Sequence, residues 1–252
     1  MSTFLLNRYR ASVLHCLLSL FFVGIVALVV YGLWYPGVIA DASGVTDVFL
    51  LLVGVDVVLG PLLTLIVFDL RKPELKRDMA VILILQLCAL IYGMYTFYVA
   101  RPVYLVFNAD RIDVVCANDL SLAALTKAEG GDFSSMPFLG PELVAAVLPD
   151  NEAEATRIVL GAVAGGDDIQ VMPQYYRAYK LRRQMAVSAS RSLSQLRKIN
   201  AGRLGKLNLE LRQYEEFGDL GYLPVIARRN NIIALVDLKK GNILAYMNYR
   251  PF

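Results

Sequence analysis

The chain has 252 residues, of which 57% are hydrophobic and 19% are charged, and its formal net charge is +3. An average soluble domain is about 45–50% apolar and about 25% charged. The charges are unevenly placed: residues 1–100 carry only 6 basic and 6 acidic side chains, whereas residues 101–252 carry 19 and 16. This pattern excludes a disordered chain and a single soluble domain, and the small net charge does not favour a nucleic-acid binder.

Three apolar runs fill the first hundred residues, at about residues 12–35, 48–68 and 79–98. Each run is about 20 residues long, and a helix of about 20 residues crosses a hydrocarbon core of about 30 Å. A soluble helix needs a polar face, and these runs have almost none. The sequence therefore predicts a membrane domain of three transmembrane helices at residues 1–100, followed by a second domain at residues 101–252.

The charges beside the runs predict their orientation. Two cations precede the first run, four lie between the second and third, and the loop between the first and second has none. Basic residues stay on the cytoplasmic side of a membrane. We therefore expect a cytoplasmic N-terminus and a second domain outside the cytoplasm.

A cleaved signal peptide is the alternative for the first run. Arg8 and Arg10 resemble an n-region, and residues 40–42 (Ala-Asp-Ala) have the form of a cleavage site. A signal peptide usually has an apolar region of about 7–15 residues, and the first run is longer. We expect the first span to be retained.

The second domain has the pattern of an α+β extracytoplasmic domain with antiparallel hairpins. Segments rich in β-branched and aromatic residues, separated by turn residues, predict strands. They lie at residues 102–108, 112–116, 222–227, 232–238 and 242–248.

Three helices are also expected in this domain. The first covers residues 140–148, between two prolines, and the second follows Asn151 as its N-cap and ends near residue 164. The third covers residues 178–200, because apolar residues recur there at helical spacing. This apolar stripe consists of Leu181, Met185, Ala189, Leu193 and Leu196.

The sequence contains few residues or motifs that could support catalysis. Its one histidine, His15, lies in the first run, which excludes histidine-dependent triads in the second domain and removes the commonest zinc ligand there. No Walker A, dinucleotide-binding or metalloprotease motif is present. Asp167 and Asp168 precede a turn and are interpreted as solvated, and Cys116 as a small buried apolar group. We therefore expect no enzyme, no cofactor and no metal site.

Aromatic and basic residues alternate over residues 174–183 (QYYRAYKLRR). Outside the cytoplasm such a stretch can meet anionic lipid headgroups or an acidic partner. The simpler interpretation is the start of an amphipathic helix with tyrosines packed inward and cations in water.

Asp56 is the most informative residue, because it lies in the middle of the second run. A carboxylate at that depth costs about 2.5–3.5 kcal/mol on insertion scales, so it should face a partner and not lipid. Counting the helical rise places Tyr92 of the third run at the same depth, and its hydroxyl is a candidate partner. Three roles stay open for Asp56: an internal polar contact, a contact with the membrane helix of another protein, and a step in a proton relay.

Three more residues of these runs are candidates for contact with a partner helix. Gly60 and Pro61 interrupt the second run, and a proline there frees a carbonyl and favours a kink. Gln86 of the third run forms, with Ser19 of the first, a second polar layer.

Several segments together resemble a known family. They are the second run (LLLVGVDVVLGPLLTLIVF), the junction ARPVYLVF after the third run, FLGPELVAA, AGGDDIQVMPQYYRAY and the last thirty residues. With these segments the chain is similar to the TfpX/TfpZ family of type IV pilin accessory proteins, from about residue 33 to residue 252.

The resemblance implies a non-enzymatic protein of a Gram-negative inner membrane, with the second domain in the periplasm. Such proteins act as accessory factors or pilin-specific chaperones that modulate assembly of a cognate major pilin. The expected partners are then that pilin, through its membrane helix and its head, and the lipid bilayer, with no nucleic acid. The alternative class is a membrane-anchored sensor or transport subunit.

Overall fold

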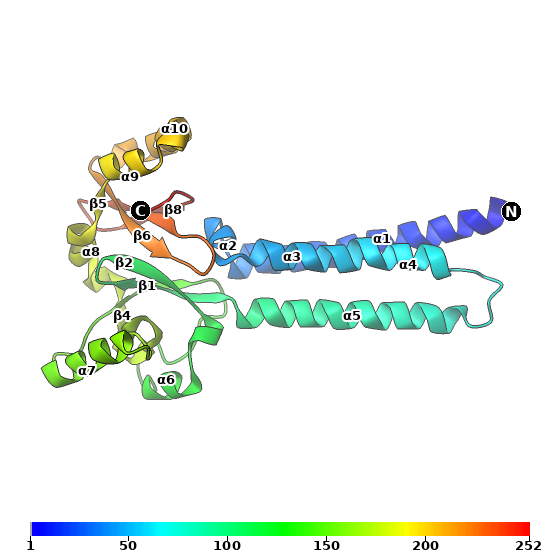
Figure 1. The fold of residues 1–252 in the computed structure, drawn as a ribbon, viewed down its shortest axis with the longest axis horizontal. Coiled ribbons are helices and arrows are strands. Elements are labelled where there is room, and N and C mark those ends of the chain that lie inside the picture. Colours follow the sequence, from blue (N-terminus) through cyan, green and yellow to red (C-terminus); the bar gives the residue numbers. More distant parts are fainter. Residues whose placement is uncertain (1) are drawn as a thin grey trace. The chain divides into compact units, whose positions relative to one another are not determined.

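The structure is a computed structural model and describes residues 2–252. Two compact units make up the chain (Figure 1). Unit 1 contains the residues up to Leu33 and Val45–Val99, and unit 2 contains Trp34–Gly44 and Ala100–Phe252.

Unit 1 consists of three long apolar helices. Helix α1 (Ser2–Val29) continues into a π-helical turn at Val30–Trp34. The second helix is composed of α3 (Val45–Val53), a π-helical turn (Gly54–Leu59) and α4 (Gly60–Val67), and the third is α5 (Leu75–Val99).

All three predicted spans are confirmed as helices long and apolar enough to cross a membrane. The observed spans are Leu6–Trp34, Val45–Val67 and Leu75–Val99. Most of their large apolar side chains are exposed, as expected of helices that lipid surrounds. The protein is thus a membrane anchor joined to a mixed α+β domain.

Unit 2 is built on one mixed sheet in the order β4-β3-β1-β2-β6-β7-β8, with β5 paired to β6. Neighbouring strands are antiparallel except for β1 with β3 and β2 with β6. The strands are β1 (Pro102–Asn108), β2 (Arg111–Cys116), β3 (Glu142–Ala146), β4 (Tyr176–Ala178), β5 (Arg191–Ser192), β6 (Leu220–Ile226), β7 (Ile232–Asp237) and β8 (Ile243–Met247).

Short helices cover the sheet. They are α2 (Val38–Ser43), α6 (Leu122–Lys127), α7 (Glu152–Val163), α8 (Arg183–Ala189), α9 (Leu193–Ile199) and α10 (Leu204–Leu211). Six 3-10 turns join them: Ala117–Asp119, Ile169–Val171, Pro173–Tyr175, Tyr179–Leu181, Ala201–Arg203 and Arg212–Phe217.

Helix α2 lies between the first two spans in the sequence, yet it is part of the core of unit 2. Ile39 and Ala42 are buried in the same cluster as strand residues such as Leu223. The backbone N–H groups of Arg229 and Asn230 donate to the carbonyl of Ala42, at 3.0 and 3.2 Å. The sequence predicts this segment as part of the membrane domain, because a short loop carries no sign of a distant partner.

The first hairpin, the three terminal strands and α7 match the predicted elements closely. Asn151 caps α7 as expected, since its side chain accepts a hydrogen bond of 3.1 Å from the N–H of Glu154. The turn of the first hairpin places Ala109 at a φ of 54°.

The helix predicted over residues 140–148 is wrong, because this segment is strand β3. It pairs with β1 on one side and β4 on the other. Val144 and Ala145 point to opposite faces of the sheet and are both completely buried. Burial on two faces outweighs the helix propensity of the segment.

The long helix predicted over residues 178–200 is also wrong. Residues 191–192 leave the helix and pair with β6, and Ser192 then caps α9 by accepting from the N–H of Gln195. The apolar stripe is broken accordingly: Leu196 is fully buried, whereas Leu181 is 67% exposed.

Candidate functional site

The second span changes its hydrogen-bonding pattern at Asp56. In the π-helical turn, the Gly60 N–H bonds to the carbonyl of Val55, five residues back, and Pro61 has no N–H to give. The carbonyl of Asp56 therefore loses the donor that a regular helix would provide.

Side chains of the other two spans complete the hydrogen bonds of this break. Gln86 Nε2 donates to the carbonyl of Asp56 at 3.2 Å. From α1, Ser12 Oγ donates to the carbonyl of Pro61 at 2.9 Å, and Cys16 Sγ lies 3.9 Å from the carbonyl of Val57. An interrupted helix in lipid needs such partners, because no water is available there.

One further polar pair joins α1 to the second span. His15 Nδ1 lies 2.6 Å from the hydroxyl oxygen of Thr64, which is completely buried. Together with Ser12, Cys16 and the buried Ser19, His15 forms a polar stripe along one face of α1.

The helices approach closely at Gly60 and at Gly93. A Cβ at Gly60 would overlap the side-chain amide of Gln86, and a Cβ at Gly93 would lie 2.5 Å from a methyl group of Leu52. Gly60 therefore fixes the position from which Gln86 reaches Asp56.

A cavity of about 220 Å³ lies between α1 and α5, beside Asp56. We call it the Asp56 groove, and its lining residues are His15, Leu18, Ser19, Phe22, Asp56, Leu83, Gln86, Leu87 and Leu90. Asp56 is only 5% exposed. Asp56 Oδ2 and Gln86 Oε1 are buried without a hydrogen-bond partner among the described residues.

This arrangement suits an occupant that brings hydrogen-bond donors. Both unsatisfied atoms are acceptors, and leaving a buried acceptor unpaired costs about 1–3 kcal/mol. The walls beside them are leucine and phenylalanine side chains. A partner helix with an apolar surface and a donor group at this depth would match the groove.

Of the five residues chosen from the sequence, Asp56 and Gln86 line the groove, and Gly60 and Pro61 form the helix break beside it. The fifth does neither. Tyr92 is 72% exposed and makes no hydrogen bond to Asp56, so the expected hydroxyl partner is wrong. The helical rise gives the depth of a residue but not the direction of its side chain around the helix axis.

Ser12, Cys16 and Thr64 are not among the residues predicted from the sequence, and His15 is considered there only for catalysis. Their signal was present, because Ser12, His15, Cys16 and Ser19 recur at spacings of three, one and three in an otherwise apolar run. That spacing places all four on one face of a helix.

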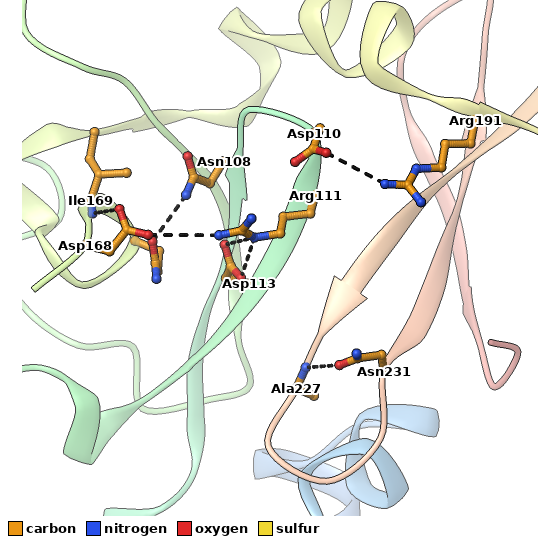
Figure 2. Close-up of polar contacts among 10 residues, drawn as sticks. Asn108, Asp110, Arg111, Asp113, Asp168, Ile169, Arg191, Ala227 and Asn231 are labelled. Atoms are coloured by element: carbon orange, nitrogen blue, oxygen red, sulfur yellow. Dashed lines mark hydrogen bonds and ion pairs between the residues drawn. The ribbon is translucent and has the colours of Figure 1, made fainter. Parts of the chain in front are cut away.

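In unit 2, Asp168 contacts residues around the first hairpin (Figure 2), whereas Asp167 is exposed. Asp168 accepts from the N–H of Ile169 at 2.7 Å and lies 3.9 Å from Arg111, which also pairs with Asp113 at 3.1 Å. Burial raises the pKa of Asp113 above its usual value, although Arg111 opposes this shift.

The basic and aromatic stretch has the expected burial but not the expected helix. Tyr176 and Tyr179 are buried, whereas Arg177 and Lys180 are exposed. The segment forms the short strand β4 between the 3-10 turns Pro173–Tyr175 and Tyr179–Leu181. Within residues 2–252, no three His, Cys, Asp or Glu side chains converge on a point that suits a metal.

Comparison with known proteins gives consistent matches. The family model "Fimbrial assembly protein FimB" matches residues 3–37. A Dichelobacter nodosus protein described as "Fimbrial assembly protein, serogroup I" is 32% identical over 247 residues, which cover 96% of this chain and 95% of that protein.

Two further proteins of the same organism also match. The serogroup E1 fimbrial assembly protein is 31% identical over 96% of this chain and 95% of its own length. The protein of serogroups C1 and C2 is 39% identical over 121 residues, which are 47% of this chain and 92% of that protein. No solved structure matches the chain.

Proposed function

Because the chain belongs to the family of fimbrial assembly proteins, we propose that it is an inner-membrane accessory protein that binds its cognate type IV pilin before polymerisation. In this role it acts as a pilin-specific chaperone of the kind that the TfpX/TfpZ resemblance implies. A pilin awaiting assembly is held in the membrane by one apolar helix, so the partner surface should lie within the spans.

The observation that carries this proposal is the Asp56 groove. It combines apolar walls with two buried acceptor atoms that have no partner among the described residues. Helix association in lipid gains no hydrophobic driving force, and it depends on packing and on a few polar contacts. A pilin helix that donates to Asp56 and Gln86 would remove the cost of these unsatisfied atoms.

The proposal includes an orientation. The cations at Arg8, Arg10 and residues 71–77 would lie in the cytoplasm, and unit 2 would lie in the periplasm, where the pilin head is. A reporter enzyme that works only in the periplasm, fused after Phe252, should be active. Activity of a cytoplasm-dependent reporter at that position would reverse the orientation.

The test of the groove is co-purification of pilin with Asp56 variants. We expect Asp56→Leu to reach normal abundance in the membrane but to recover at least about tenfold less pilin, because the loss of about 1.4 kcal/mol is a tenfold loss of affinity. Asp56→Asn keeps an acceptor oxygen and should recover most of the pilin.

Thr96→Val is a matched control, because the Thr96 hydroxyl donates only to the carbonyl of Tyr92 in its own helix, at 2.9 Å. It should not change pilin recovery. If Asp56→Leu lowers abundance and recovery together, Asp56 has a structural role. If it lowers neither, the groove does not bind the pilin.

A further inference from the structure

Two large apolar side chains of unit 2 are exposed next to each other in the loop before β3. Phe138 is 58% exposed and Leu139 is 65% exposed. No charged residue occurs from Phe133 to Pro141. The loop is therefore uncharged over its whole length, and its exposed pair of large apolar side chains forms a small apolar patch.

Phe138 packs against Trp34. The two rings meet edge to face with centroids 6.3 Å apart, and Trp34 is only 5% exposed. Trp34 is also the last residue of the first span. A tryptophan at the end of a span lies at the membrane–water interface, so the residue that contacts it lies at that level as well.

The connections of unit 2 lead to the same conclusion. The chain passes between the spans and unit 2 at three places: after Leu33, after Gly44 and after Val99. The third span ends at Val99 and strand β1 starts at Pro102, so only two residues connect this span to the sheet. An apolar cleft of about 550 Å³ lies at the end of the loop, and residues 36–39 and Pro141 are part of its lining.

We propose that Phe138 and Leu139 insert into the interfacial layer of the bilayer, so that residues 137–139 anchor unit 2 to the lipid surface. Burial of exposed apolar side chains in the headgroup and acyl boundary is favourable. The occupant of this surface is therefore lipid, and the proposal is independent of pilin binding.

Leu160 provides a matched control, because it is 62% exposed on α7. The segment after α7 reaches Asp168, which pairs with Arg111 beside the turn of the first hairpin (Figure 2). The whole length of β1, which is seven residues or about 20 Å, separates that turn from the start of the strand. Leu160 thus has the exposure of Leu139 without the neighbouring span end.

The experiment uses tryptophan fluorescence, because Trp34 is the only tryptophan of the chain. Full-length Trp34→Phe protein is the background, into which Leu139→Trp, Phe138→Trp or Leu160→Trp is introduced. Each variant is reconstituted in bilayers with or without lipids brominated near the headgroup end of the acyl chains.

We expect the tryptophan at position 139 or 138 to emit at shorter wavelength and to be quenched at least about twofold by the brominated lipid, as an interfacial ring should be. The tryptophan at position 160 should be quenched by acrylamide in the water and not by the lipid. The proposal is wrong if positions 138 and 139 behave like position 160. The proposal is equally wrong if the tryptophans at positions 138 and 139 become shielded from water only when pilin is added, because the surface would then bind a protein.

Discussion

Gln86 on α5 donates its side-chain N–H to the backbone carbonyl of Asp56, at 3.2 Å, where the second span is interrupted. The hydrogen bond replaces one that the π-helical turn and Pro61 remove from the span itself. The third span therefore stabilises the backbone of the second, and the cavity beside Asp56 depends on their close approach at Gly60.

Gly60→Ala should destabilise unit 1, because its Cβ would overlap the Gln86 amide and break the bond to Asp56. Such polar contacts in membranes are worth about 0.6 and up to about 2 kcal/mol. Thermal unfolding in detergent should show a lower Tm. Gly54→Ala is the control, since a Cβ there meets no described atom within 4 Å. Equal Tm values for the two variants would contradict the proposed close contact.

Asn200→Asp should strongly destabilise unit 2. Asn200 is 6% exposed, donates to the carbonyls of Leu196 and Arg250 at 3.0 and 2.9 Å, and accepts from the Arg250 N–H. A carboxylate would face two carbonyl oxygens, at a cost of about 2 kcal/mol or more. At Asn208, by contrast, the side-chain oxygen accepts from Arg197 at 3.1 Å. Asn208→Asp should therefore leave the Tm unchanged or slightly higher, and a similar loss at both positions would refute the assignment.

The stability of the Asp113→Asn variant relative to the wild type should increase as the pH rises. Burial raises the pKa of Asp113, and the nearby Asp168 raises it further, while Arg111 and Asn108 oppose the shift. A carboxyl with a raised pKa in the folded state stabilises the protein most at low pH, and this contribution is lost as the pH rises through that pKa. The Tm of the variant minus that of the wild type should increase between pH 4 and pH 7. A constant difference would show that burial does not dominate at this site.

Cys116 should be inert in the folded protein. It is 1% exposed, and burial raises its pKa to about 11. At pH 8 only about 0.1% of such a thiol is the reactive thiolate. Peptide mapping by mass spectrometry should show that iodoacetamide labels Cys116 at least about 100-fold more slowly than an exposed cysteine introduced by Ser188→Cys. Comparable rates would mean that the strand end opens readily.

The sequence predicts the elements that local patterns determine. The three spans, the first hairpin, the terminal strands and the cap at Asn151 depend on composition and neighbouring residues, and all are present. Strand β3 does not depend on local pattern, because its two neighbours in the sheet are about 35 residues away on each side. Residues 178–200 fail for the same reason, since pairing of residues 191–192 with β6 interrupts the helix.

The candidate site shows a similar division. Counting residues places Gln86 in a second polar layer apart from Asp56, whereas in the structure Gln86 donates to the carbonyl of Asp56 and packs against Gly60. The direction of a side chain around its helix depends on packing, so Tyr92 points away and His15 reaches Thr64 instead.

Because of helix α2, the chain cannot be cut after the third span without removing part of the core of unit 2. Ile39 and Ala42 fill the core under β6 and β7, and the carbonyl of Ala42 binds the N–H of Arg229, 187 residues later. A soluble fragment that starts at residue 101 would lack these side chains and would keep a hole in its core. During synthesis, likewise, the α2 segment is made directly after the first span, long before the strands that cover it. Unit 2 therefore completes its core only when the last strands have been made.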